Sequence, residues 1–510
     1  KYKETFKVPS IKSTAIWGGV LVTVISGFSL ILENKWEFSL SKGISFGIIG
    51  LSMVLLTGYA GEINLAPLAF AGIGAITAYQ FDVGSGVETG AGFATLAVLL
   101  AVLFGYLVFP AFGINRYKLW ASISIFSAGV FILVTVFDGT TGTGIASRES
   151  MSISAFVVAA LVSGAVGAAV ALPALRLRGL YLGLATFAFA IFVDKMVYKQ
   201  RRSLSLDVPF VGDGEDITFN IFNNGALNIP RPGFWGIDFN HNQSAMLILL
   251  SIVFSLISFL LVVLRRSTYG RQLSAMKDSP AACATLGLNM VKLKLSVFTL
   301  AAAIAGFGGA LHASNLRAIQ EDAPFTVFEG LALFMLTVVG GIGYISGALI
   351  GGILYGTAFI VMGDFWEKLA TDWSSFGWLF TIIHDFFIFV GPAMAGIGLG
   401  RNPNGIASQV FDGYRALRRR EARPILWIGT IITVVFWSLR VSEVIDGWTF
   451  LLLFFPTILL SPLIAEAKTK DLRQTQTQPL ELIGIDQDFS QEILDELNEQ
   501  LNLPATPANS

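Results

Sequence analysis

Long apolar stretches recur along most of the chain and limit what it can fold into. Each is about 17 to 25 residues long, the length that an α-helix needs to cross a ~30 Å hydrocarbon layer. Hydrophobic residues make up 54% of the sequence and charged residues only 14%. This apolar content exceeds that of water-soluble domains, so the sequence predicts an all-α polytopic membrane protein. The predicted spans are 15–33, 40–57, 62–80, 91–112, 118–137, 151–173, 177–197, 244–264, 295–314, 325–343, 345–362, 375–398, 424–440 and 447–464.

These stretches predict a bundle of roughly 12–14 transmembrane helices with broken or re-entrant segments. The apolar residues of the tail recur at helical spacing, which favours a short amphipathic helix there. Five regions are expected: a basic N-terminus with the first span (1–39), a core (40–400), a basic linker (401–423), two extra spans (424–464) and an acidic tail (465–510).

The basic residues gather in short loops, and this distribution predicts the orientation. If the polar loop 265–294 is cytoplasmic, the N-terminal lysines, the linker 401–423 and most other basic clusters fall on the same side, as the positive-inside rule requires. Both termini are then cytoplasmic, and the long loop 198–243 faces outward. The formal net charge is −1 and there is no broad basic face, which argues against nucleic acid as a partner.

The loop 265–294 is a polar interruption between two apolar runs, and it contains the signals of a short helix. Ser279 can cap it, Pro280 suits its first position, and Gly287 can supply a left-handed stop. A helix of under two turns is not stable alone, so its neighbours must hold it or it must dock on a partner. Its small apolar surface is expected to consist of Ala281, Ala282, Cys283, Ala284 and Leu286.

Glycine is dense in the apolar runs, and two interpretations are open. Small residues allow helix backbones to pack closely, or glycine pairs mark broken helices whose backbone lines a cavity. The stretch 55–75 favours a broken helix, because Pro67 removes a backbone donor and Gly58, Gly61 and Asn64 flank it.

Few ionisable residues lie within the apolar runs. Glu329 stands near the start of one run, Asp194 and Lys195 close another, and His384 with Asp385 interrupts a third. Charges at such positions are costly and are candidates for function, although each can equally serve a structural role. Neighbours in sequence point to different faces of a helix, so His384 and Asp385 cannot act as an i, i+4 ligand pair.

Catalytic signatures are missing from the sequence. There is no GxxxxGK[ST] phosphate loop, no HExxH and no GxSxG in a strand and helix context. The single cysteine, Cys283, excludes an internal disulfide and a cysteine-based zinc site. We therefore expect no catalytic residue, no metal and no cofactor bound by this chain, and ATP, if it is used, must be bound by another polypeptide.

Four stretches resemble the permease subunits of ATP-binding-cassette importers for branched-chain amino acids and related small polar solutes. The first, GLSMVLLTGYAGEINLAPLAFAGIGA, is similar to the family's GLSLNLLTGYAGQLSLGHAAFFGIGA. This chain departs from that pattern, with Ala66-Pro67 in place of Gly-His, and Glu62 and Asn64 in place of Gln and Ser. The four stretches are Gly50–Ala75, Ala174–Ala190, Gly270–Leu311 and Phe328–Gly352.

The resemblance implies the permease subunit of an ATP-driven importer that works by alternating access in the bacterial cell membrane. It implies as partners two cytoplasmic ATPase subunits, a second permease subunit, an extracytoplasmic solute-binding protein and membrane lipid. It maps the coupling to the ATPases onto Gly270, Arg271, Met276, Lys277, Asp278, Ser279, Pro280, Ala281, Ala282 and Gly287.

The translocation path is expected near two broken-helix ends, Gly58–Asn64 and Gly340–Gly343, which would present backbone groups to the carboxylate and ammonium of an amino acid. A proton-coupled secondary transporter of amino acids is the alternative, but it would need a chain of carboxylates and histidines within the membrane. An enzyme acting on lipid or glycan would need a cluster with ligand spacing, which the acidic residues of 207–216 lack. The path candidates are Gly58, Gly61, Glu62, Asn64, Thr186, Glu329, Gly340 and Gly341.

Overall fold

The structure is a computed structural model of the chain, and it describes residues 10–390 and 423–464 with gaps. Of the predicted regions, the linker up to residue 422, the acidic tail with its predicted amphipathic helix and much of the loop 198–243 lie outside the described residues. The gaps are 31, 82–90, 113–115, 138–149, 175–176, 178, 199–203, 207–216, 220–225, 235–236, 321–324, 443, 446, 448, 451–452, 455–456, 458–460 and 462–463.

The described residues are mainly helical, which confirms the all-α prediction. Three pairs of very short antiparallel strands lie in the connections: β1 (Leu204–Leu206) with β2 (Ile217–Phe219), β3 (Ala226–Asn228) with β6 (Ala318–Gln320), and β4 (Gly233–Phe234) with β5 (Ile237–Asp238). The helices are α1 (Ile11–Ser29), α2 (Asn34–Met53), η1 (Val54–Tyr59), α3 (Pro67–Tyr79), α4 (Ala91–Val108), η3 (Phe109–Phe112), α5 (Arg116–Phe137), α6 (Ile153–Ala174), α7 (Leu180–Val193), η4 (Asp194–Tyr198), α8 (Gln243–Arg266), α9 (Thr268–Asp278), α10 (Pro280–Thr285), α11 (Met290–Leu316), α12 (Val327–Gly341), α13 (Ile345–Ile353), η5 (Leu354–Ala358), α14 (Phe359–Asp372), η6 (Ser374–Phe376), α15 (Gly377–Phe389) and α18 (Arg423–Val441).

Eight helices among the described residues are long and apolar enough to cross a membrane, and four further apolar helices are shorter. The chain is therefore a multi-pass membrane protein. Each of the first thirteen predicted spans overlaps a helix, whereas the last, 447–464, is only partly described. The predicted span 62–80 begins too early, because the chain is non-helical from residue 61 to residue 66 and α3 starts at Pro67.

Side-chain caps fix where several helices begin. The Asn242 Oδ1 accepts a hydrogen bond from the Ala245 N–H at 3.0 Å, and the Asn289 Oδ1 accepts one from the Lys292 N–H at 3.0 Å. Such caps satisfy backbone donors that the first turn of a helix leaves free. They start α8 and α11, the two helices between which the polar loop lies.

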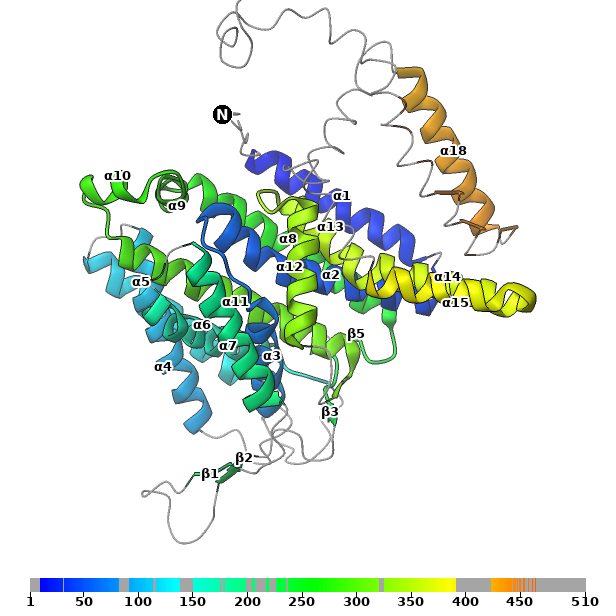
Figure 1. Ribbon diagram of the computed structural model, residues 1–510. Coiled ribbons are helices and arrows are strands. Elements are labelled where there is room, and N and C mark those ends of the chain that lie inside the picture. The colour runs from blue at the N-terminus through cyan, green and yellow to red at the C-terminus, as the bar shows by residue number, and fades with distance from the viewer. Residues whose placement is uncertain are drawn as a thin grey trace, which may run out of the picture. The chain divides into compact units, whose positions relative to one another are not determined.

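Contacts divide the chain into two compact units, Lys1–Gln409 and Val410–Ser510. In the second unit, Trp437 on α18 lies edge-on to Phe450, with 6.4 Å between ring centroids. In the first unit, α11 is the central helix and packs against α6, α3 and α2, while α2 also packs against α13 and α8. Figure 1 shows α9 and α10 at one end of this core and β3 and β5 at the other.

Glycines allow the closest helix contacts of the core. A Cβ atom on Gly309 of α11 would lie 2.0 Å from the Ala71 carbonyl oxygen of α3. One on Gly352 of α13 would lie 2.3 Å from the Gly47 nitrogen of α2. Backbones that pack at such distances leave no room for a side chain, so close packing is one role of these glycines.

We expect the substitution Gly309→Ala to destabilise the protein by about 1–3 kcal/mol or more, because the new methyl group overlaps the backbone of α3. The matched control is Gly129→Ala on α5, where a Cβ atom meets nothing within 4 Å. Alanine has the higher helix propensity, so the control should be neutral or stabilising by up to about 1 kcal/mol. Thermal unfolding of the purified protein in detergent measures both, and equal midpoints would contradict the prediction.

Candidate functional site

The short helix predicted from its capping signals is present as α10. The Ser279 Oγ accepts a hydrogen bond from the Ala282 N–H at 3.3 Å, and Pro280 occupies the first helical position. Gly287 follows the helix with a φ of +79°, a conformation that favours glycine. The sequence-based prediction of this helix is therefore confirmed, although it ends at Thr285, one residue before the predicted Leu286.

One side of α10 is open and one is packed. Ala281, Ala282, Ala284 and Leu286 are exposed, and Leu286 has 81% of its surface accessible. Cys283 is only 2% exposed, so the expectation that it belongs to the open surface is wrong. The helix lies against α9 and α11, and the face that carries Cys283 is the buried one.

The preceding helix, α9, is anchored to the core by its apolar face. Tyr269, Leu273 and Met276 are buried, and the Tyr269 ring stacks on Phe112 with 4.6 Å between centroids. The Tyr269 hydroxyl shares a hydrogen bond of 2.9 Å with Ser296 of α11, and burial raises the pKa of this hydroxyl. Met276 is thus a packing residue, whereas Arg271, Lys277 and Asp278 lie on the exposed face.

The anchoring of α9 begins at Gly270, one of the predicted coupling residues. A Cβ atom there would lie 2.3 Å from the Arg265 carbonyl oxygen, so the turn from α8 into α9 requires glycine. The two helices therefore meet at a tight corner, which a side chain at position 270 would obstruct.

Both predicted helix breaks are present, and they touch. The first separates η1 from α3 and contains Gly61 with a φ of +74°. The second separates α12 from α13 and follows Gly341, the last residue of α12, which has a φ of +111°. A Cβ atom on Gly58 would lie 2.2 Å from the Ile342 carbonyl oxygen, so the two breaks pack backbone to backbone. At the second break, a Cβ atom on Gly340 would lie 2.2 Å from the Gly347 carbonyl oxygen.

Two basic residues join residues 265–287, which comprise the end of α8 with α9 and α10, to these breaks. We call residues 265–287 the coupling segment, after their predicted role. The Lys277 Nζ of α9 donates a hydrogen bond to the Gly58 carbonyl at 3.0 Å, and the Lys277 stem occupies the space beside Gly61. The Arg265 Nη1 donates to the Gly343 carbonyl at 3.3 Å, and its guanidinium lies 4.4 Å from the centre of the Tyr59 ring. Helix C-termini carry free carbonyls and partial negative charge, which basic groups stabilise. We call these two contacts the basic clamp.

An ion pair ties the first break to α11. Glu62 Oε1 and Lys294 Nζ are in direct contact, and the two side chains are only 11% and 13% exposed. Glu62 stands where the resembling family has glutamine, so this departure has a structural partner in the chain. Lys294 lies in the first turns of α11, directly after the coupling segment.

Asn64 and Thr186 shape the return of the chain into α3. The Asn64 Oδ1 accepts a hydrogen bond from the Ala66 N–H at 3.0 Å, which is a local turn. The Thr186 Oγ1 of α7 accepts one from the Leu65 N–H at 3.0 Å and donates to the Gly183 carbonyl at 2.9 Å. Both side chains are buried, and these polar atoms hold the break in shape.

The path candidates therefore divide into two places. Gly58, Gly61, Glu62, Asn64, Thr186, Gly340 and Gly341 gather around the breaks, beside the coupling segment. Glu329 lies in the first turn of α12, at the opposite end of that helix from Gly341. Its Oε2 has no hydrogen-bond partner among the described residues.

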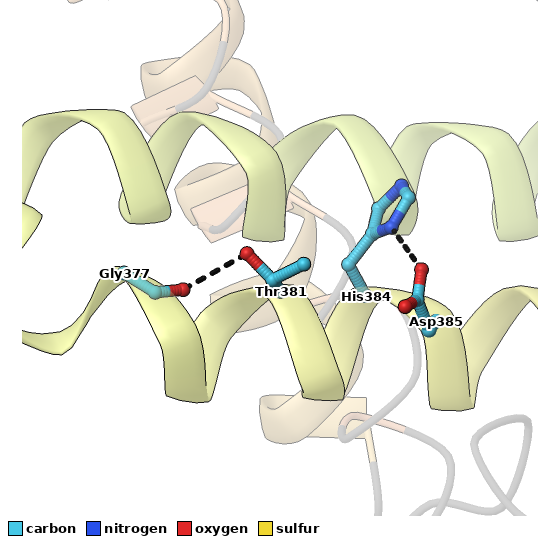
Figure 2. Close-up of polar contacts among 4 residues, drawn as sticks. All are labelled: Gly377, Thr381, His384 and Asp385. Carbon is cyan, nitrogen blue, oxygen red and sulfur yellow. Dashed lines mark hydrogen bonds and ion pairs between the residues drawn. The ribbon is translucent and has the colours of Figure 1, made fainter.

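His384 and Asp385 make a local contact on α15. Figure 2 shows the His384 Nδ1 facing the Asp385 Oδ1 at 3.1 Å, while Thr381 bonds back to the Gly377 carbonyl at 3.0 Å. The Asp385 side chain is 59% exposed. Among the described residues, no group of three or more His, Cys, Asp or Glu side chains is arranged to hold a metal. The pair thus has the geometry of a local hydrogen bond between neighbouring residues of one helix.

Sequence reasoning missed a buried polar network at the end of the core away from α9. Arg231 is 2% exposed; it donates from Nη1 to the Phe239 carbonyl at 3.0 Å and from Nη2 to the side chain of Gln243. Burial lowers the pKa of Arg231 to about 10, so it remains charged at neutral pH. Sequence reasoning also missed Lys42 and His312, although both are ionisable residues inside apolar runs, a signal that could have identified them.

A double-mutant cycle tests the ion pair of the first break. We expect Glu62→Gln and Lys294→Met each to destabilise the protein by about 3–5 kcal/mol, because each leaves a largely buried charge without its partner. The double variant should cost less than the sum of the two, since neither charge remains. Thermal unfolding in detergent gives the coupling, and strictly additive effects would show that the two charges do not interact.

Comparisons with known proteins agree with this architecture. Residues 139–384 match the family model described as "Branched-chain amino acid transport system / permease component". The chain is similar to the high-affinity branched-chain amino acid transport system permease protein LivM of Salmonella typhimurium, with 29% identity over 41% of this chain and 51% of that protein. It is also similar to BraD of Pseudomonas aeruginosa, with 24% identity over 60% of this chain and 93% of that protein.

The chain thus spans about half the length of the LivM relatives. The permease protein LivH of Escherichia coli is 22% identical over 59% of this chain and 91% of its own length. No solved structure matches the chain. Through residues 139–384, the chain is similar to the permease components of branched-chain amino acid transport systems.

Proposed function

We propose that this chain is the membrane-spanning permease subunit of an ATP-driven importer in a bacterial cell membrane. Its solute would be a branched-chain amino acid or a related small polar molecule, moved by alternating access. The family model and the names of the relatives support this class of solute. The observation that carries the mechanism is the basic clamp, in which Lys277 and Arg265 join the coupling segment to both helix breaks.

The clamp suggests how force would reach the membrane helices. A partner that docks on the exposed apolar residues of α10 moves α9 with it, because the two short helices are packed together. Motion of α9 carries the Lys277 ammonium, which holds the end of η1 through the Gly58 carbonyl. A ligand or partner shifts such an equilibrium only by binding one state better than the other. The permease then needs no reactive side chain and no cofactor of its own.

The proposed partners follow from this arrangement and from the family. Two cytoplasmic ATPase subunits would engage α10 of this chain and the corresponding helix of a second permease subunit. An extracytoplasmic binding protein would deliver solute at the opposite end, where β3, β6 and the buried Arg231 lie. This orientation places both termini in the cytoplasm.

A proton-coupled transporter of amino acids remains the second candidate because of one observation. Inside the helical core, the ionisable group of Lys42 interacts with those of Glu329 and His312. Such groups within a membrane protein also occur in proton relays. Energy coupling therefore has to be measured directly.

We expect proteoliposomes that contain the assembled transporter and its binding protein to accumulate leucine only when ATP is enclosed in the vesicle lumen, on the side of the ATPase subunits. A protonophore should leave the initial rate unchanged, because no proton gradient drives uptake. Vesicles with an ATPase subunit that cannot hydrolyse ATP are the control. Uptake that a protonophore abolishes, and that proceeds without ATP, would establish the secondary transporter instead.

The substitution Lys277→Met tests the clamp, since it keeps most of the stem and removes the ammonium. A hydrogen bond to a charged group contributes about 1.5–3 kcal/mol, so we expect uptake to fall about tenfold or more while ATP hydrolysis continues. Lys292→Met is the matched control, because Lys292 is an exposed lysine in the first turn of α11 and is not among the predicted coupling residues; this variant should retain more uptake. Equal uptake by the two variants would show that the clamp transmits nothing.

A further inference from the structure

A cluster of polar side chains lies in the core away from the basic clamp. It consists of Lys42 on α2, His312 on α11, Glu329 on α12 and Tyr355 on η5. The Glu329 carboxylate interacts electrostatically with Lys42 and Tyr355, and Lys42 interacts in the same way with His312. Four segments far apart in the sequence therefore converge on one place.

The cluster occupies the end of the core opposite to the coupling segment. Lys42 precedes Tyr59 by about 25 Å of helix at 1.5 Å per residue, and His312 follows Lys294 by about 27 Å. Tyr59 and Lys294 belong to the region of the clamp and the first break. The helices α2, α11 and α12, which approach one another near the clamp and the breaks, thus meet again at their other ends, around this cluster.

The Ser45 hydroxyl contacts both the His312 ring and the Lys42 backbone. The Ser45 hydroxyl donates its single hydrogen to the Lys42 carbonyl at 2.8 Å, and its Oγ lies 2.7 Å from the His312 Nδ1. With its hydrogen on that carbonyl, the Ser45 oxygen accepts from Nδ1–H. In a neutral imidazole the other nitrogen, Nε2, is then an acceptor. The ring is 0% exposed, and Nε2 has no partner among the described residues.

Two acceptors and one cation are thus left without direct partners. The Glu329 Oε2 is, like the His312 Nε2, a buried acceptor with no hydrogen bond from the described residues. Among these residues, Lys42 forms no ion pair, although its ammonium interacts electrostatically with the Glu329 carboxylate. Unpaired polar groups of this kind are costly inside a membrane protein. A ligand that brings the complementary groups would remove the cost.

The ligand that would satisfy these two acceptors and this cation carries one ammonium and one carboxylate. The ammonium would donate to the His312 Nε2 and the Glu329 carboxylate, and the carboxylate would bind the Lys42 ammonium. Lys42 and Glu329 together carry no net charge, so a neutral zwitterion preserves the balance, whereas a simple cation or anion leaves one charge in excess.

Aromatic rings border the cluster and suit an aliphatic side chain. The Phe46 ring lies 4.2 Å from the His312 ring and 4.8 Å from the Tyr355 ring, between centroids. The Phe325 ring stands edge-on to His312 at 5.9 Å. We propose that Lys42, His312 and Glu329 form a binding site for zwitterionic amino acids with aliphatic side chains. This proposal rests on the proposed transport function and names the contacts that the solute makes.

The test uses the purified permease and ATPase assembly without its binding protein, so that only the membrane site is observed. Binding of leucine, of leucinamide, which lacks the carboxylate, and of 4-methylpentanoate, which lacks the ammonium, is measured by saturation-transfer NMR. We expect leucine to bind the unmodified assembly better than either analogue. Glu329→Gln, His312→Gln and Lys42→Gln should each weaken leucine binding at least tenfold.

The pattern across the analogues separates recognition from damage. Lys42→Gln should bind leucine and leucinamide about equally, and Glu329→Gln should lose its preference for leucine over 4-methylpentanoate. Glu329→Asp keeps the charge and should recover part of the leucine binding. The matched controls are Lys35→Gln and Asp364→Asn, which break an ion pair of 2.8 Å between α2 and α14 and should bind leucine normally.

Three results would overturn the site. The first is leucine binding by the three variants that is as strong as in the unmodified assembly. The second is a proportional loss of the binding of leucine, leucinamide and 4-methylpentanoate. The third is the absence of leucine binding by the unmodified assembly. Uptake by the complete transporter with its binding protein separates this failure from that of the proposed function. If the unmodified transporter imports leucine and the variants import it equally well, the site is wrong and the transport function stands. If the unmodified transporter imports no amino acid, the proposed function fails as well.

Discussion

The hydrogen bond from Lys277 to the Gly58 carbonyl is the contact on which the rest of the arrangement depends. A helix that breaks inside a membrane protein leaves carbonyls that need hydrogen-bond donors from outside that helix. Here the coupling segment supplies the missing donors, because Lys277 and Arg265 reach the carbonyls at both breaks. The same bonds that make the broken helices tolerable therefore join them to the part of the chain that lies outside the bundle.

The central helix, α11, connects the two ends of the core. Near its start Lys294 pairs with Glu62 at the first break, and near its end His312 belongs to the polar cluster. Glycines such as Gly309 let α3 pack against it without intervening side chains. Tightly packed helices move as units and do not deform continuously. A displacement of the backbone at the clamp would thus also displace the residues of the cluster, through α2, α11 and α12.

Particular residues show how far the sequence alone could go at the site. Ser279, Pro280 and Gly287 predicted α10 correctly, since caps and left-handed stops are local properties of the chain. Cys283 was placed on the wrong side, because the burial of a residue on a short helix depends on its neighbours. Gly58 and Gly340 were expected to face a solute, and their partners proved to be backbone atoms of the facing segments. Periodicity and capping contain no information on such partners.

The sequence by itself determined that the chain is a helical, multi-pass membrane protein, where the helices lie and where two of them break. These features follow from length, hydropathy and the local chemistry of glycine and proline. Only the tertiary structure decided that the two breaks touch, that Glu62 pairs with Lys294, and that Lys42, His312 and Glu329 converge. Each of these contacts joins residues far apart in the chain, and the rotation and crossing of packed helices determine them.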